Sequence, residues 1–160
     1  MLVLELLSKK VQSIPNSIYV QSEMNSFTFR EVDYASNYIA NIIQEIECEI
    51  VPIYVKNDIL TVPLLLGILK SGKIPLPISK DHDFELAKKN ISDINYDKIL
   101  TDIEDLPNTI YITKSVYQEK ISFLQKKRNG KGCFIVSTSG STGVPKKVLI
   151  NEESLINVLI

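Results

Sequence analysis

A run of small hydroxyl-bearing and glycine residues near the end of the sequence has the composition best suited to chemistry. Residues 137–143 read Ser-Thr-Ser-Gly-Ser-Thr-Gly, and they directly follow the apolar run at 133–136. Such residues fill a core poorly, but their hydroxyls and backbone N–H groups can donate to an anion, and glycine allows close approach of the main chain. Lys146, three residues further on, adds a positive charge. The stretch therefore predicts a phosphate-binding loop. The residues assigned to it are Thr138, Ser139, Gly140, Ser141, Thr142, Gly143 and Lys146.

Three other glycine-containing phosphate or nucleic-acid loops fit this stretch less well. A Walker loop needs Gly-Lys-Ser/Thr after four intervening residues, but Pro145 occupies the position of the second glycine. A dinucleotide fingerprint needs a third glycine at a spacing that is absent here. The Gly-x-x-Gly of KH modules is also present, although the chain has no basic excess. An exposed hairpin tip without a ligand remains the structural alternative.

The whole string at 138–147, TSGSTGVPKK, resembles the signature loop of the adenylate-forming (AMP-binding) ligases. This superfamily includes acyl-CoA synthetases, luciferases and the adenylation domains of non-ribosomal peptide synthetases. Its pattern is Thr-Ser-Gly-Ser/Thr-Thr-Gly-x-Pro-Lys-Gly, and the chain departs from it where Lys147 replaces the last glycine. Residues 27–43 and 64–79 resemble two earlier motifs of the family, in the same order. The Ser-Thr variant of the loop favours the peptide-synthetase type.

The resemblance implies an enzyme that activates a carboxylate substrate, with an amino acid favoured, as an acyl-adenylate for transfer to a thiol. ATP and Mg²⁺ are the implied cofactors, and the loop would hold the β- and γ-phosphates. The family's adenine, ribose and carboxylate pockets and its catalytic lysine follow the loop, so no catalytic residue is assigned here. We therefore expect no activity from this chain alone. The expected partners are the C-terminal remainder of the domain, or a complementary subunit, and a carrier protein. The alternative is a non-catalytic partner-binding or assembly module that retains the fold.

Composition limits the other classes of function. The chain has 160 residues, of which 44% are hydrophobic and 23% charged, with a net charge of −1. We expect residues 1–160 to form a single α/β domain that is the incomplete N-terminal portion of an adenylation domain. The charge balance favours neither nucleic acid nor an anionic membrane as partner. One histidine and two distant cysteines, Cys48 and Cys133, predict no metal site and a cytoplasmic location.

Hydrophobic periodicity predicts alternating helices and strands, which is typical of an α/β fold with a mostly parallel sheet and helices on both faces. Ser71-Gly72 is expected to end the helix that reaches Lys70, and two prolines at 74–78 indicate a strand end or an edge. The polar, lysine-rich segment at 113–131 is expected to be an insertion or a loop. Helices are expected at 2–13, 29–47, 58–70, 83–92 and 152–160, and strands at 18–20, 27–29, 50–55, 74–78, 98–101, 110–112, 132–137 and 147–150.

Overall fold

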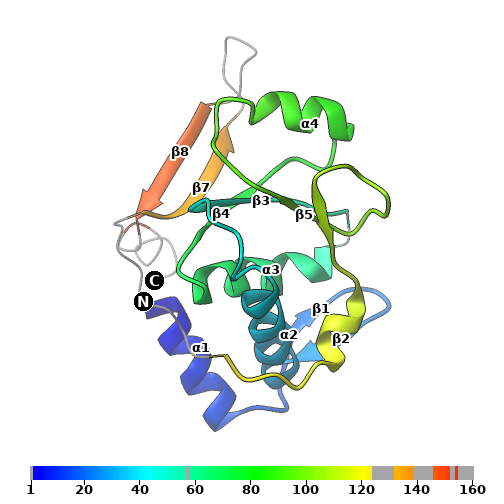
Figure 1. Cartoon of the computed structure of the whole chain (residues 1–160). Helices are drawn as coiled ribbons and strands as arrows, with labels where there is room; N and C mark the ends of the chain where they lie inside the picture. Colours follow the sequence, from blue (N-terminus) through cyan, green and yellow to red (C-terminus); the bar gives the residue numbers. More distant parts are fainter. Residues whose placement is uncertain (1, 57, 124–131, 139–145, 152–153, 155–160) are drawn as a thin grey trace.

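A four-stranded parallel sheet forms the centre of the molecule (Figure 1). The structure is a computed structural model that describes residues 2–56, 58–123, 132–138, 146–151 and 154. The sheet has the order β4-β3-β5-β6, so the chain runs outward to β4 and then crosses back to the other side of β3. Its strands are β3 (Ile50–Tyr54), β4 (Ile74–Pro77), β5 (Ile99–Thr101) and β6 (Thr109–Tyr111).

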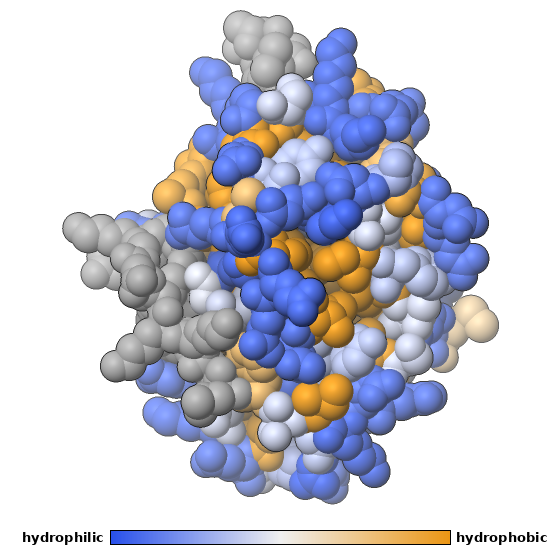
Figure 2. All heavy atoms as spheres, in the orientation of Figure 1, coloured by the Kyte–Doolittle hydropathy of each residue, from blue (hydrophilic) through white to orange (hydrophobic). Residues whose placement is uncertain are grey.

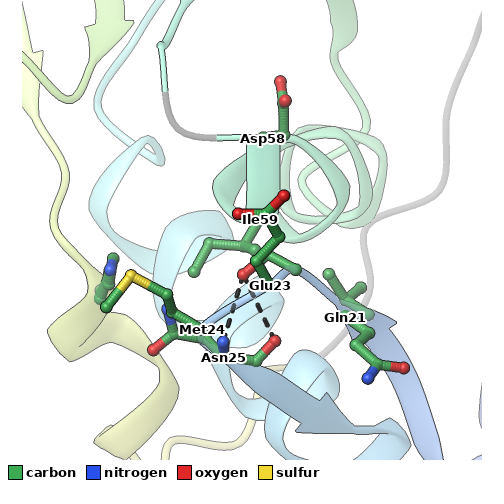
Figure 3. Close-up of a pocket in the computed structure, with 9 residues that line it drawn as sticks. Gln21, Glu23, Met24, Asn25, Asp58 and Ile59 are labelled. Atoms are coloured by element: carbon green, nitrogen blue, oxygen red, sulfur yellow. Dashed lines mark hydrogen bonds between the residues drawn. The ribbon is translucent and has the colours of Figure 1, made fainter.

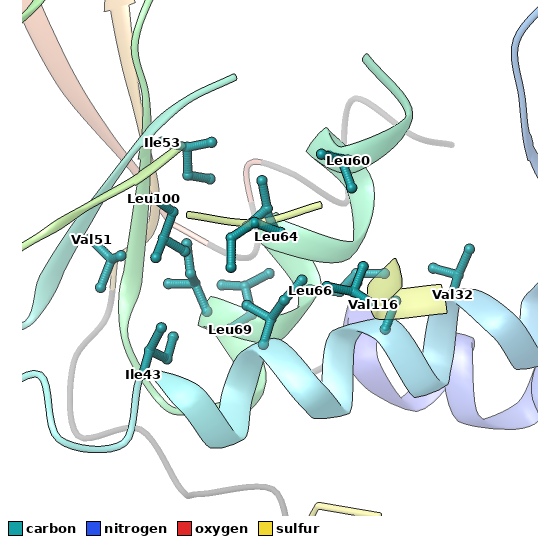
Figure 4. Close-up of a cluster of buried hydrophobic side chains, with 14 of the residues drawn as sticks. Val32, Ile43, Val51, Ile53, Leu60, Leu64, Leu66, Leu69, Leu100 and Val116 are labelled. Atoms are coloured by element: carbon teal, nitrogen blue, oxygen red, sulfur yellow. The ribbon is translucent and has the colours of Figure 1, made fainter. Parts of the chain in front are cut away.

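Helices cover both faces of this sheet, as the sequence predicts. The first apolar cluster joins α1, α2 and α3 to one face through side chains such as Val51, Ile53 and Leu100 (Figure 4). A second cluster joins α4 to the opposite face through Tyr54 and Ile99. Because side chains alternate along a strand, one short sheet supplies both clusters. The helices are α1 (Leu2–Ser13), α2 (Phe29–Ile42), α3 (Asp58–Lys70) and α4 (Phe84–Asn90).

The start of α2 is fixed by local hydrogen bonds. The Thr28 backbone N–H donates to Glu31 Oε2 at 2.8 Å, and the Glu31 N–H donates to Thr28 Oγ1 at 3.3 Å. This reciprocal capping box satisfies two N–H groups that the helix leaves unpaired. Phe29, which the predicted strand at 27–29 and the predicted helix at 29–47 share, is the first residue of α2, because the cap at Thr28 has already turned the chain. The helix also ends at Ile42, earlier than expected.

The end of α3 is closed by glycine, as the sequence predicts. Gly72 has a φ of 83°, which is the left-handed region that glycine adopts without strain. Its N–H donates to the Leu69 carbonyl at 3.0 Å, and the Lys73 N–H donates to the Ile68 carbonyl at 3.1 Å. These two bonds form a Schellman motif, which satisfies carbonyls at the helix end and sends the chain into β4.

Pro63 lies inside α3, so one backbone hydrogen bond of the helix is missing. It has no N–H to donate to the carbonyl four residues earlier, that of Ile59. The buried Tyr117 hydroxyl donates to this carbonyl at 2.5 Å. Tyr117 belongs to a 3₁₀ helix, η1 (Lys114–Gln118), and its ring stacks on Phe27 with centroids 3.5 Å apart. The prediction of a plain loop at 113–131 is therefore wrong for this part, because Tyr117 and Val116 are core residues.

We expect Tyr117→Phe to lower the free energy of unfolding by about 1–2 kcal/mol, because the buried Ile59 carbonyl would lose its donor. The same change should cost clearly less in a Pro63→Ala background, where residue 63 regains an N–H for that carbonyl. Urea denaturation of the four proteins of this double-mutant cycle measures the difference. Equal costs in both backgrounds would contradict the pairing of Tyr117 with the proline.

β4 is an edge strand of the parallel sheet, which confirms one of the two positions that its prolines predict. The N–H group of Ile74 donates to the carbonyl of Glu49, just before β3, and that of Ile78 donates to the carbonyl of Ile53 in β3, both at 2.8 Å. Hydrogen bonding alternates along a strand, so Pro75 and Pro77 fall at positions whose nitrogen faces away from β3. Their missing N–H groups weaken any hydrogen-bonded ladder on that outer side. The strand β7 (Gly132–Thr138) lies beside β4 there without joining its ladder (Figure 1).

Two antiparallel hairpins complete the described fold. The first pairs β1 (Ile18–Gln21) with β2 (Ser26–Thr28), which correspond to the strands expected at 18–20 and 27–29. The second pairs β7 with β8 (Lys146–Asn151). The expected helix at 152–160 lies outside the described residues apart from Ser154, whose N–H donates to Asn151 Oδ1 at 2.7 Å. In the part of the chain that the structure describes, every helix is too short or too polar to cross a bilayer.

Candidate functional site

The β7–β8 hairpin brings together the two ends of the predicted phosphate loop. Thr138 closes β7, Lys146 opens β8, and the two are paired in register. Residues 139–145 are outside the described part of the chain, so the assignments of Ser139, Gly140, Ser141, Thr142 and Gly143 stay predictions. The structure describes the two strands that flank the predicted loop. Thr138 and Lys146, eight residues apart in sequence, are adjacent across an antiparallel ladder. Lys146 is exposed at the end of the ladder that is next to the loop.

Lys147 occupies an ordinary strand position opposite Ser137. Among the described non-glycine residues, a positive φ occurs at Asp105 and Asn108 and not at Lys147. The side chain is therefore accommodated at the position of the family's glycine without backbone strain. Successive side chains of a strand point to opposite faces, so Lys146 and Lys147 diverge.

The Lys147 ammonium group contacts a carboxylate far away in the sequence. It donates to Asp93 Oδ1, in the turn that follows α4. Only 12% of the lysine side chain is exposed, against 68% for the aspartate. The hydrogen bond from Lys147 holds the pKa of Asp93 below its usual value. The pair connects the hairpin to the α4 side of the sheet, and sequence analysis had assigned neither residue to a contact of this kind.

Apolar contacts also join the hairpin to the rest of the fold. Ile135 of β7 belongs to the cluster that contains Leu76 and Phe84, on the α4 side. Cys133 is buried in the other cluster, with residues of α1, α2 and α3. β7 therefore contributes to both cores, and this packing positions the two described ends of the loop at the edge of the sheet.

Comparison with known proteins identifies the family. A family model described as AMP-binding enzyme matches residues 7–160. The chain belongs to the AMP-binding enzyme family. The described ends of the predicted signature, Thr138 and Lys146, lie on the β7–β8 hairpin, and Lys147, its departure from the expected pattern, is accommodated in β8.

Individual relatives agree with the assignment to the AMP-binding family. Bacitracin synthase 1 of Bacillus licheniformis is 26% identical over 166 residues, covering 96% of this chain and 3% of the synthase. The fold is shared with a fatty acid AMP ligase from Legionella pneumophila, with a TM-score of 0.77, 20% identity, and coverage of 98% of this chain and 31% of the ligase. It is also shared with NpsA-ThdA, an artificially fused adenylation–PCP di-domain from Klebsiella oxytoca, with a TM-score of 0.70, 21% identity, and coverage of 93% and 32%. The chain thus spans about a third or less of each of these proteins.

Two clefts lined by described residues lie elsewhere, around the first turn of α3. One, of about 560 Å³, lies between the β1–β2 turn and α3 (Figure 3). Glu23 and Asp58 contribute carboxylates to its lining, and Met24 is 91% exposed beside them. The other, of about 240 Å³, lies at the carboxyl ends of β3 and β4, where Lys80 pairs with Asp58 at 2.6 Å. The described linings of both clefts contain no residue of the β7–β8 hairpin.

Cys48, the cysteine that lies outside the β7–β8 hairpin, is held in its thiol form. Cys48 Sγ donates to Asp97 Oδ1 at 3.1 Å, and this hydrogen bond, with burial, raises the pKa of the thiol. Asp97 also accepts from the backbone N–H groups of Glu47 and Cys48, which lowers its own pKa. The group is structural, since it joins the segment between α2 and β3 to the residues just before β5. The described residues contain no cluster of three or more His, Cys, Asp or Glu side chains suited to a metal ion.

Proposed function

We propose that this chain is the N-terminal portion of an adenylation domain, spanning residues 1–160, in an ATP-dependent ligase that activates a carboxylate, with an amino acid favoured. The family match over residues 7–160 is the observation that carries the proposal. ATP would supply the phosphorus that the substrate carboxylate oxygen attacks, with pyrophosphate leaving. The acyl group would then pass to a thiol. Peptide synthases among the relatives support an amino acid as substrate.

The proposed work of this chain is to bind the β- and γ-phosphates during that attack. Thr138, Ser139, Ser141 and Thr142 would donate hydrogen bonds, and Gly140 and Gly143 would admit the phosphates closely. Lys146 would offset the charge that develops on the departing pyrophosphate, together with Mg²⁺. The residues present suit an anion, because Ser137, Thr138 and Lys146 lie at this end of the hairpin and the sequences of β7 and β8 contain no acidic residue.

The proposed partners are the rest of the adenylation domain and a carrier protein. β8 leaves Val148 and Leu149 about half exposed, at 49% and 55%. Figure 2 shows apolar surface at the left edge of the molecule, where Figure 1 places β8. Packing of the remaining domain against this strand would cover the apolar side chains. A carrier protein as the thiol acceptor agrees with the adenylation–PCP fusion among the structures of the same fold.

Pyrophosphate exchange in the full-length protein tests the proposal. The wild-type protein should exchange labelled pyrophosphate into ATP in the presence of one or a few of the proteinogenic amino acids. Lys146→Ala should slow this exchange about 30-fold, mainly in kcat, because the charge is needed most as pyrophosphate leaves. Lys89→Ala, which removes an exposed lysine from α4, is the matched control and should leave the rate unchanged.

One result would contradict the ligase function, and another would contradict only the role of Lys146. Exchange that no amino acid or other carboxylate stimulates would remove the ligase assignment and favour the non-catalytic binding module. An unchanged rate in Lys146→Ala would keep the ligase assignment but exclude the proposed role of this lysine.

A further inference from the structure

The β7–β8 hairpin is attached to the central sheet without a hydrogen-bonded ladder between described strands. β7 lies beside β4, but Pro75 and Pro77 remove N–H groups from the outer side of β4. Side-chain contacts of described residues therefore contribute to the attachment. Apolar contacts such as that of Ile135 are non-directional, so they favour burial without fixing how the hairpin is oriented.

The Lys147–Asp93 pair supplies a directional contact at the end of the β7–β8 hairpin that is next to the loop. Lys147 is one residue from Lys146 and is paired with Ser137, one residue from Thr138. Its partner Asp93 lies 54 residues away, in the turn after α4, on the body of the fold. Because most of the lysine side chain is covered, the ammonium group has little freedom to move away from the carboxylate. The contact thus acts next to both described ends of the loop.

We propose that Lys147 is a positioning residue for the phosphate loop. By pairing with Asp93, Lys147 fixes the loop end of the β7–β8 hairpin against the segment after α4. This inference rests on the proposed function. Lys147 itself does not contact the phosphates, because its side chain leaves the strand on the face opposite to that of Lys146. The contact orients Lys146 before ATP binds, and preorganisation of this kind improves affinity without adding a contact to the ligand.

The device belongs to this sequence and not to the family pattern. Glycine, the residue of the pattern at this position, has no side chain with which to form an ion pair. Lys147→Gly, which restores the pattern, should therefore weaken ATP binding in this protein. Lys147→Met removes the charge but keeps an unbranched side chain of similar length, so it tests the ion pair more cleanly.

Calorimetric titration of the full-length protein with Mg²⁺ and a non-cleavable α,β-methylene analogue of ATP measures the effect without turnover. Lys147→Met and Asp93→Asn should each raise the Kd for the analogue about fivefold. The charge-reversed protein carrying Lys147→Asp and Asp93→Lys should regain an affinity within about twofold of the wild type. Lys89→Met removes a charge from exposed α4 surface and should leave the Kd unchanged.

The outcomes separate this inference from the function on which it rests. If the wild-type protein does not bind the analogue, the proposed function fails and the inference with it. If the wild type binds and Lys147→Met and Asp93→Asn bind equally well, the function stands and the inference is wrong. If both variants bind weakly but charge reversal restores nothing, the pair is not the cause and the inference is also wrong. Circular dichroism and urea denaturation identify any variant that fails to fold.

Discussion

Gly67→Ala is expected to lower the free energy of unfolding by about 3 kcal/mol, although alanine is the better helix former. Gly67 lies in α3, where α3 crosses α2. A Cβ at this position would lie 2.7 Å from Cβ and Cγ2 of Ile39 and 2.8 Å from the Ser36 carbonyl oxygen. The side chain of Ile39 is fully buried, and the Ser36 oxygen belongs to the backbone of α2, so neither can move aside freely. The gain in helix propensity is at most about 1 kcal/mol, and steric overlap therefore decides the sign.

Urea denaturation measures this loss of stability. Thr61→Ala, in the same helix but only partly buried, is the control for intrinsic helix propensity and should change stability little. Equal stability of Gly67→Ala and the wild type would mean that α2 and α3 can separate at no cost, and it would contradict the close contact described here.

Lys70→Met is expected to lower the free energy of unfolding by about 3 kcal/mol, because it removes the donor shared by one buried and one partly buried acceptor. Lys70 Nζ donates to Asp33 Oδ1 and to Asn37 Oδ1, both at 2.7 Å. The side chains of Lys70 and Asp33 are 9% and 25% exposed. Burial lowers the pKa of Lys70, while the charge of Asp33 and the hydrogen bond to it act in the opposite direction. Asn37 in turn donates to the Ile121 carbonyl at 3.0 Å, so the cation organises a contact among three segments.

A matched pair of variants separates burial from charge. Lys70→Met combined with Asp33→Ala should be more stable than Lys70→Met alone, since the unpaired carboxylate is removed as well. Lys80→Met breaks an ion pair of the same kind with Asp58, but those side chains are 45% and 78% exposed, and we expect little change. If Lys70→Met and Lys80→Met had similar effects in urea denaturation, the buried network would contribute no more than a surface ion pair.

The features that sequence analysis predicted correctly depend on residues close together in the chain. Gly72 ends α3 through bonds that span five residues or fewer. Pro75 and Pro77 predicted a strand end or an edge, and β4 is an edge strand, since a missing N–H is a property of the residue itself. The order of helices and strands followed from hydrophobic periodicity, because burial on one face repeats with the geometry of the element. The signature at 138–147 likewise indicated the family before any fold was known.

The sequence alone therefore determined the class of fold, the ends of several elements and the location of the family signature, since each is encoded by local chemistry. The tertiary structure decided which distant side chains meet. With 18 lysine and arginine residues and 19 acidic ones, charge alone does not select Asp93 as the partner of Lys147. Nothing near Pro63 in sequence indicates that Tyr117 replaces its missing donor. Such pairings follow from how helices and strands pack, because two groups interact only where burial and register bring them within hydrogen-bonding distance.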